Sequence, residues 1–194
     1  MQAHNQLNEP NELAAGGEIT AVHPGAHPFD YLVQQAITGD DGAFTSLWRH
    51  FNPRMVRYLS MYTNEPEDLC SEVWIKIAGG VKNFEGDAAA FKGWIYTIAR
   101  NAATDLARKK KRVGITFELN ENDWVGENST MVEVIDLVKR LPKDYAEIIL
   151  LRVVADLDVN EVADIVGKLP GNVRVLTHRG LKQLNEMLTN GGDR

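Results

Sequence analysis

The chain of 194 residues is long enough for one ordinary domain or two small helical ones, and because it has no apolar run of bilayer length we expect no membrane insertion. Its single cysteine, Cys70, excludes an internal disulfide, and since zinc-ligand spacing and a secretory signal are also lacking, we expect a cytoplasmic protein without a metal or cofactor. The net charge is −6, but two segments are positive: +6 over residues 91–112 and +3 over 167–194. This distribution excludes a protein that coats nucleic acid uniformly and indicates two discrete contact surfaces.

The N-terminal part of the sequence predicts a disordered leader followed by three helices. Residues 1–28 are polar, contain three prolines and lack sustained periodicity, so we expect no fixed structure there. Helical periodicity runs over 29–39, where a glycine stops it, and over about 42–62, where Pro53 should kink or split the helix. A third helix is predicted over about 65–80, with a proline in its first turn and acids at its positive end.

The next predicted helix joins an apolar stripe to a block of positive charge. Residues 91–112 hold seven Lys or Arg against one acid. A basic face on an acidic protein indicates a phosphate-backbone partner, although a solvated helix end whose cations complement the helix dipole shows the same pattern. Arg100, Asn101 and the run 108–112 project away from the stripe or continue past it. The stripe has three- and four-residue steps and comprises Ile95, Ile98, Ala99, Ala102 and Leu106.

The second half of the sequence predicts a linker and a second helical domain. Residues 113–130 carry four acids and no Lys or Arg, so we expect an extended acidic linker. Helices near 131–140 and 143–155 follow. Residues 158–188 then predict a short helix with a capping box, a glycine turn and a longer basic helix, which is the pattern of a helix-turn-helix but also of any small helical bundle. The longer helix should bury Val173, Leu176, Leu181, Leu184 and Leu188.

Four stretches of this all-α sequence resemble one bacterial family. They are EDLCSEVWIKI, FKGWIYTIARNAATDLARKKKR, LPKDYAEIILLRVVADLDVNEVADIVG and GNVRVLTHRGLKQL. In this order they resemble an extracytoplasmic-function (group IV, sigma-70 family) RNA polymerase sigma factor. The resemblance implies sigma domain 2 over 29–112, a linker over 113–130 and a helix-turn-helix sigma domain 4 over 131–189.

The resemblance also implies a function and partners. Such a protein binds RNA polymerase core, through the clamp helices of the largest subunit and the flap of the second, and directs promoter-specific initiation without covalent chemistry. It is associated with the nucleoid while in holoenzyme, and an anti-sigma factor is a further implied partner. The segment 68–82 resembles the one that docks on the clamp helices, although core packing suits Trp74 slightly better. The candidate core-binding residues are Asp68, Glu72, Trp74, Ile75 and Lys76.

The family likeness assigns minus-ten recognition to the first domain. The loop 83–89 resembles the one that receives a flipped base, and Asn101 matches an asparagine of the promoter-contacting helix, while Arg100 and the basic run should meet phosphates. The candidates are Asn83, Phe84, Asp87, Arg100, Asn101, Arg108, Lys109, Lys110 and Arg112.

Minus-thirty-five recognition is assigned to the last helix. Two departures from the family pattern matter. Asn172 replaces the usual threonine of a Gly-Thr-Val motif, and Leu176 stands at a commonly basic position. Fewer cations imply weaker backbone anchoring or a different sequence preference. The candidates are Asn172, Arg174, Val175, His178, Arg179 and Lys182.

Three alternatives to a sigma factor follow from the residues. A free-standing helix-turn-helix regulator explains 131–189 but leaves the first basic domain without a role. A sigma-like decoy, which would bind an anti-sigma factor and not a promoter, would need no basic run at 108–112, so the presence of this run argues mildly against it. An enzyme is least expected, because no Ser/His/Asp set, phosphate-cradling glycine loop or metal constellation stands out.

Overall fold

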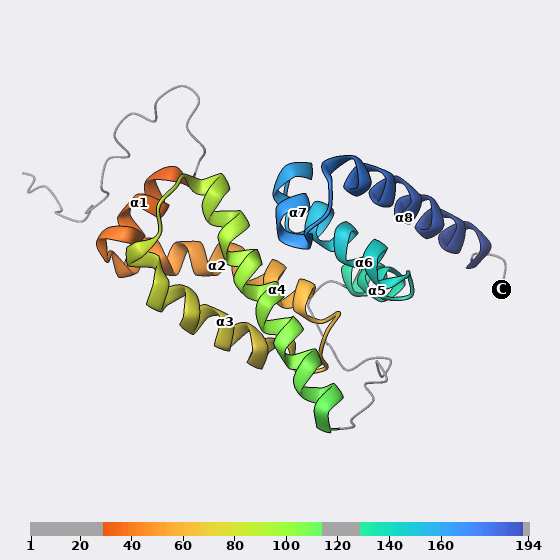
Figure 1. Cartoon of the computed structure of the whole chain (residues 1–194), viewed down its shortest axis with the longest axis horizontal. Coiled ribbons are helices and arrows are strands. Elements are labelled where there is room, and N and C mark those ends of the chain that lie inside the picture. The colour runs from red at the N-terminus through yellow and green to blue at the C-terminus, as the bar shows by residue number, and fades with distance from the viewer. Residues whose placement is uncertain (1–28, 114–128, 192–194) are drawn as a thin grey trace, which may run out of the picture.

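The computed structural model describes residues 29–113 and 129–191, which form two helical domains (Figure 1). The predicted leader and residues 114–128 of the predicted linker lie outside the described residues. The N-terminal domain contains α1 (Asp30–Thr38), α2 (Asp41–Leu59), α3 (Pro66–Gly80), the short 3₁₀ turn η1 (Val81–Asn83) and α4 (Ala88–Val113). The C-terminal domain contains α5 (Ser129–Lys139), α6 (Lys143–Ile149), the π-helical turn η2 (Leu150–Val154), α7 (Val159–Val166) and α8 (Pro170–Gly191). Neither described range contains a strand, which confirms the all-α prediction for these parts of the chain.

Local signals set three helix boundaries in the N-terminal domain. Gly39 ends α1 in the left-handed region at φ +94°, which favours glycine. Asp40 then caps α2, because its side chain accepts a hydrogen bond from the Ala43 amide at 2.6 Å. Pro66 is the first residue of α3, as predicted. Helix α2 continues through Pro53, so this residue does not split the helix.

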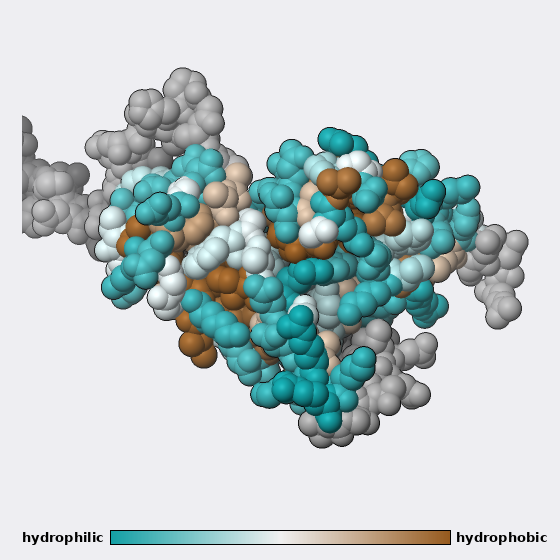
Figure 2. Space-filling view, in the orientation of Figure 1, coloured by the Kyte–Doolittle hydropathy of each residue, from teal (hydrophilic) through white to brown (hydrophobic). Residues whose placement is uncertain are grey.

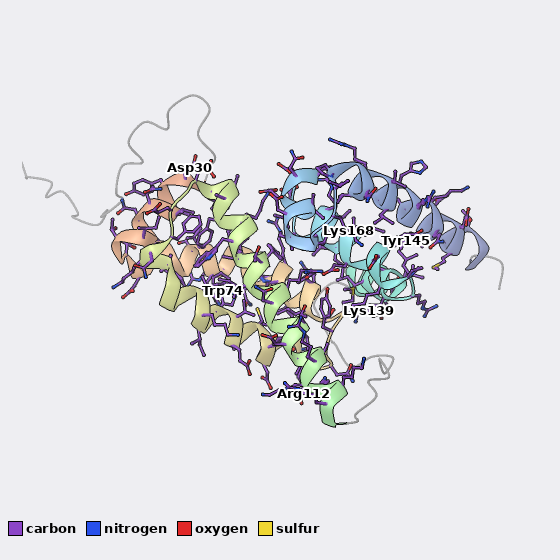
Figure 3. The ribbon with its side chains drawn as sticks, in the orientation of Figure 1. Asp30, Trp74, Arg112, Lys139, Tyr145 and Lys168 are labelled. Carbon is purple, nitrogen blue, oxygen red and sulfur yellow. The ribbon has the colours of Figure 1, made fainter. Side chains whose placement is uncertain are left out.

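Aromatic side chains fill much of the N-terminal core. Tyr58, Phe91 and Tyr96 are among the largest fully buried side chains of the described residues. Trp74 is 6% exposed and lies edge-on to Phe44, with ring centroids 5.8 Å apart. Figure 3 places Trp74 inside the N-terminal domain. This burial agrees with core packing, the role that suited Trp74 slightly better, and removes Trp74 from the candidate surface contacts with core polymerase: its indole faces the core because burying so large an apolar ring stabilises the fold.

The C-terminal domain has the predicted helix-turn-helix. Asp158 and Glu161 form a complete capping box at the start of α7, and Gly167 ends that helix at φ +67°. Two burial predictions for α8 are wrong, because Leu181 is 45% exposed and Leu188 is 52% exposed. Leu181 lines an open groove, so its side chain reaches solvent. Leu188 lies near the end of α8, which has 22 residues and packs on the seven-residue α6, so α6 is too short to cover it.

The two domains are in direct contact. Helix α4 of the N-terminal domain packs against α7, and α2 packs against η2 (Figure 1). The face of α4 that meets the C-terminal domain is therefore covered in this structure.

Candidate nucleic-acid interface

The loop between η1 and α4 is held by hydrogen bonds to its backbone. Asp87 precedes α4, and its Oδ1 accepts a hydrogen bond from the Ala90 amide at 2.8 Å. Asp30 of α1 accepts one from the Ala88 amide, also at 2.8 Å. Gly86 has φ +146°, and a Cβ there would lie 2.8 Å from the Ala90 Cβ, so a larger residue would be strained. The loop therefore has a fixed conformation, and the Asp87 carboxylate, a predicted DNA contact, is engaged as a helix cap.

An aromatic cluster anchors the same loop to α4. The Phe84 ring lies edge-on to Phe91, with centroids 5.4 Å apart, and its centroid is 5.1 Å from that of Trp94. Phe84 is half-buried and Phe91 is fully buried, whereas the neighbouring Asn83 is exposed. The predicted base-receiving segment thus combines an anchored aromatic ring with an exposed amide.

The C-terminal half of α4 presents the predicted polar and basic side chains to solvent. Asn101, Arg108, Lys109 and Arg112 are exposed, and Lys110 is half-buried. Hydrophilic side chains gather over this end of the helix in Figure 2, and Figure 3 places Arg112 near its tip. The cations stand at the negative end of the helix dipole, which stabilises them without removing their charge from the surface.

A groove of about 370 Å³ runs between this basic end and the start of α3. Acidic side chains of α3 line one wall, and cations of α4 line the other. Ile75 of α3 precedes Lys76, which lines the groove, and is 73% exposed. The structure therefore brings the predicted core-binding and minus-ten residues together along one surface. Residues from both sets that line the groove are Asp68, Glu72, Lys76, Arg108, Lys109, Lys110 and Arg112.

Helix α8 presents all six predicted minus-thirty-five residues on its exposed face. The apolar member, Val175, is 47% exposed. The turn before α8 is tied to the domain by Lys168, whose Nζ lies 2.9 Å from Asp144 Oδ2 on α6 (Figure 3). Packing holds the helix close to α6, since a Cβ at Gly180 would lie 2.7 Å from Ile149 Cδ1. The exposed residues are Asn172, Arg174, Val175, His178, Arg179 and Lys182.

Arg100, predicted to meet DNA phosphates, is paired with a carboxylate instead. Its Nε donates to Glu147 Oε1 of α6 at 2.8 Å. The same oxygen accepts hydrogen bonds from the Tyr62 hydroxyl at 2.7 Å and the Tyr58 hydroxyl at 3.3 Å. The predicted phosphate contact of Arg100 therefore stays a prediction, and in this structure the guanidinium faces the C-terminal domain because a buried carboxylate there needs donors.

Burial and charge shift the pKa values of this cluster. Burial alone lowers the pKa of Arg100, but the hydrogen bond and the negative charge of Glu147 outweigh it and raise the pKa above the ordinary value. Burial is also the main reason why the pKa values of Tyr58 and Tyr62 are raised, and the charge of Glu147 raises both further. Both phenols therefore stay protonated at neutral pH and remain hydrogen-bond donors.

Both domains match families of known proteins. The sequence matches Sigma-70 region 2 over residues 47–113 and Sigma-70, region 4 over residues 131–184, together more than half of the chain. The ECF RNA polymerase sigma factor BldN of Streptomyces coelicolor is 28% identical over 170 residues, which are 81% of this chain and 64% of BldN. ShbA of Streptomyces griseus, also an ECF RNA polymerase sigma factor, is 28% identical over 177 residues, 80% of this chain and 93% of ShbA.

The chain belongs to the extracytoplasmic-function sigma factors. Solved structures share the fold of this sigma factor. CnrH in complex with the cytosolic domain of CnrY gives a TM-score of 0.61 at 19% identity, over 86% of this chain and 99% of the other. RpoE of Bartonella quintana, in complex with the anti-sigma factor NepR, gives 0.62 at 21% identity, over 78% and 98%. The chain spans less than two thirds of the length of BldN, but nearly all of ShbA.

Members of this family are transcription initiation factors. Among residues 29–113 and 129–191 of this sigma factor, no group of His, Cys, Asp and Glu could hold a metal ion. Within the same ranges, none of the helices has the length and apolar character needed to cross a bilayer.

The thiol of Cys70 in this sigma factor should be unreactive in the native state. Burial raises its pKa to about 12, from an ordinary value of 9.0, and its Sγ donates to Asn52 Oδ1 at 3.3 Å. Because the thiolate is the nucleophile, and because it is suppressed at every pH below that raised value, alkylation by iodoacetamide at pH 8 should be at least about 100-fold slower than in the urea-unfolded chain. Mass spectrometry of the alkylated protein measures both rates, and equal rates would contradict the prediction.

Proposed function

We propose that this sigma factor binds RNA polymerase core and directs initiation at promoters whose two elements are read by its two domains. Two separate exposed basic surfaces, one at the end of α4 and one on α8, support this proposal. Each surface offers few contacts on its own. When polymerase holds both, binding of the second becomes intramolecular, and two weak readouts act as one specific readout. The site of action is the nucleoid in the cytoplasm.

Helix α3 is the proposed contact with the clamp helices of the largest polymerase subunit. Asp68, Glu72 and Lys76 are exposed at four-residue spacing, so they form one row along the helix. The exposed Ile75 adds an apolar contact beside the row. A row of charges next to one aliphatic side chain suits a partner helix with complementary charges and a small apolar patch. The C-terminal domain is the proposed partner of the flap.

The loop 83–87 and Asn101 are the proposed readers of the minus-ten element. Extruding a base costs a few kcal/mol of unstacking. A loop already fixed by Asp30 and Gly86 adds little further ordering cost when the base is bound. The exposed cations at 108, 109 and 112 are the proposed contacts to phosphates, which fix the register but carry no sequence information.

The exposed face of α8 is the proposed reader of the minus-thirty-five element in the major groove. Arg174 and Arg179 have the donors for bidentate contacts to guanine, and Val175 offers an apolar contact of the kind that a thymine methyl accepts. His178 and Lys182 add polar contacts on the same face. An anti-sigma factor is a further proposed partner, as the RpoE structure contains one.

Binding to purified bacterial core polymerase tests the proposed function. We expect a complex of this chain with core in gel filtration, and a binding constant from fluorescence anisotropy. Ile75→Asp, combined with Lys76→Glu, should weaken core binding at least about tenfold, because each change removes a contact of the proposed surface. Tyr31→Ala is the matched control, since Tyr31 is 64% exposed on α1, away from α3. Absence of any complex, or tight sequence-specific DNA binding without core, would favour the free-standing regulator.

Asn101→Ala should impair promoter opening more than initial docking. The amide is exposed on α4 and is proposed to contact a base only once the strands separate. We expect a roughly 5- to 150-fold lower rate of open-complex formation, corresponding to one good base contact of about 1–3 kcal/mol. Stopped-flow fluorescence from a 2-aminopurine label in the minus-ten element measures opening, and filter binding at low temperature measures docking. Equal losses at both steps would remove the proposed base contact.

A further inference from the structure

A polar cluster centred on the buried Glu147 joins the two domains at the face of α4 that carries Arg100. Glu147 of α6 is 6% exposed. One of its carboxylate oxygens accepts hydrogen bonds from Arg100 Nε at 2.8 Å, from the Tyr62 hydroxyl at 2.7 Å and from the Tyr58 hydroxyl at 3.3 Å. All three donors come from the N-terminal domain. The charge of Glu147 is thus compensated only while the domains are together.

A second contact lies further along the same face of α4. The Lys92 Nζ donates to the backbone oxygen of Asp156 and lies 3.9 Å from Glu161 Oε2. Asp156 has φ +56°, unusual for a residue other than glycine, in the segment between η2 and α7. Lys92 and Arg100 are eight residues apart, so both point to the same side of the helix. Two cations of α4 are therefore held by the C-terminal domain.

This arrangement cannot read both promoter elements at once. The minus-ten and minus-thirty-five elements are about 25 base pairs apart, or roughly 85 Å along straight duplex DNA at 3.4 Å per base pair. Helices α4 and α8 have 26 and 22 residues, so at about 1.5 Å per residue they are about 39 and 33 Å long. Even placed end to end they would reach only about 72 Å, so domains that stay joined by the hydrogen bond from Arg100 to Glu147 cannot span that separation. The contact must break before the sigma factor can occupy a promoter.

The chemistry of the cluster suits a reversible contact. A guanidinium binds carboxylate and phosphate with the same donors, so Arg100 can hold Glu147 or a DNA phosphate at one position, but not both. Because both ions are hydrated once the domains separate, much of the buried attraction is offset by regained hydration. Removing only one partner while the interface stays closed leaves a buried charge unpaired, which favours opening.

We propose that Glu147 is an intramolecular inhibitor that holds the free sigma factor closed by competing with promoter phosphate for Arg100. Lys92 and the backbone oxygen of Asp156 hold the other end of the interface. Binding to polymerase core shifts the chain to the open form by separating the domains. The inhibitory consequence rests on the proposed function, whereas the closed conformation itself does not.

The conformation of the free chain tests the closed state without polymerase. Nitroxide labels at the exposed Thr45 of α2 and Asn185 of α8 report the separation of the domains by pulsed electron paramagnetic resonance, once Cys70 is replaced by alanine. The parent chain should give one narrow distance distribution. Glu147→Lys, which places a cation opposite Arg100, should broaden the distribution and shift it to longer distances.

Two further variants show whether a changed distribution in Glu147→Lys reflects separation of the domains or a folding defect. Asp144→Asn is the matched control, because Asp144 lies three residues before Glu147 and its ion pair with Lys168, at 2.9 Å, stays within the C-terminal domain. It should keep the narrow distribution. Lys92→Ala changes only the N-terminal domain and should shift the distribution in the same direction as Glu147→Lys. An unchanged distribution in both variants would overturn the proposed closed state.

Measuring the affinity of the same variants for core polymerase distinguishes a failure of the inhibitory role from a failure of the proposed function. If the closed form must open first, Glu147→Lys should bind core severalfold more tightly, because the apparent dissociation constant scales inversely with the fraction of open molecules. Opening without any gain in affinity would overturn the inhibitory role. If neither the parent chain nor the variant binds core, the proposed function fails, while the distance measurement still decides whether Glu147 holds the domains together.

Discussion

Replacing Arg174 and Arg179 together by alanine should reduce transcription from recognised promoters by roughly thirtyfold or more, because each bidentate arginine contact to a base contributes about 1–3 kcal/mol and about 1.4 kcal/mol corresponds to a factor of ten. Both side chains are exposed on α8. Affinity for core polymerase should not change, since the proposed core contacts lie on α3 in the other domain. Single-round transcription with purified holoenzyme measures the first effect, and anisotropy with labelled core measures the second.

Arg140→Ala is the matched control for this loss. Arg140 is an exposed arginine of the same domain, in the turn directly after α5 and outside the proposed recognition helix α8. It should leave transcription within about twofold, as surface substitutions away from functional features usually do. Normal initiation by the Arg174 and Arg179 double variant would show that α8 does not read the promoter.

Neutralising the basic end of α4 should reduce the salt dependence of promoter binding. In the variant with Arg108, Lys109 and Arg112 replaced by glutamine, three exposed cations near the negative end of the helix dipole are lost. Each phosphate contact contributes about 0.9 to the slope of log affinity against log salt, so the slope should fall by up to about 2.7. The affinity itself should fall most at low salt, because screening already weakens these contacts at high salt.

This slope is measured from the binding of holoenzyme to a labelled promoter at about 50 to 200 mM salt. Phosphate contacts show their effect on affinity over about this range. Arg49→Gln, an exposed cation on α2 of the same domain, is the control and should leave the slope unchanged. A triple variant with the slope of the parent chain would mean that these cations only complement the helix dipole.

Helix ends were the part of the fold that the sequence predicted best. Gly39, Pro66 and Gly167 all act as predicted, and Asp158 forms the expected capping box. These signals are reliable because a cap or a turn depends on a few neighbouring residues and their backbone angles. The exposed face of α8 followed in the same way, since helical spacing alone separates its outer residues from the buried Val173.

Contacts between the domains could not be predicted from local patterns. Periodicity placed Arg100 off the apolar stripe, but its partner lies 47 residues away in the other domain. One signal was present: Glu147 is the only charged residue in the apolar run 146–151, where an unpaired carboxylate would be costly to bury. The pattern could indicate that Glu147 needs a donor, but not which one.

Transcription by purified bacterial core polymerase on genomic DNA fragments, with and without this chain, is the decisive experiment for promoter-directed initiation by this sigma factor. We expect discrete run-off transcripts that require both proteins and disappear when the Arg174 and Arg179 double variant replaces the parent chain. No chain-dependent transcript from any fragment, together with no complex between the chain and core, would contradict it.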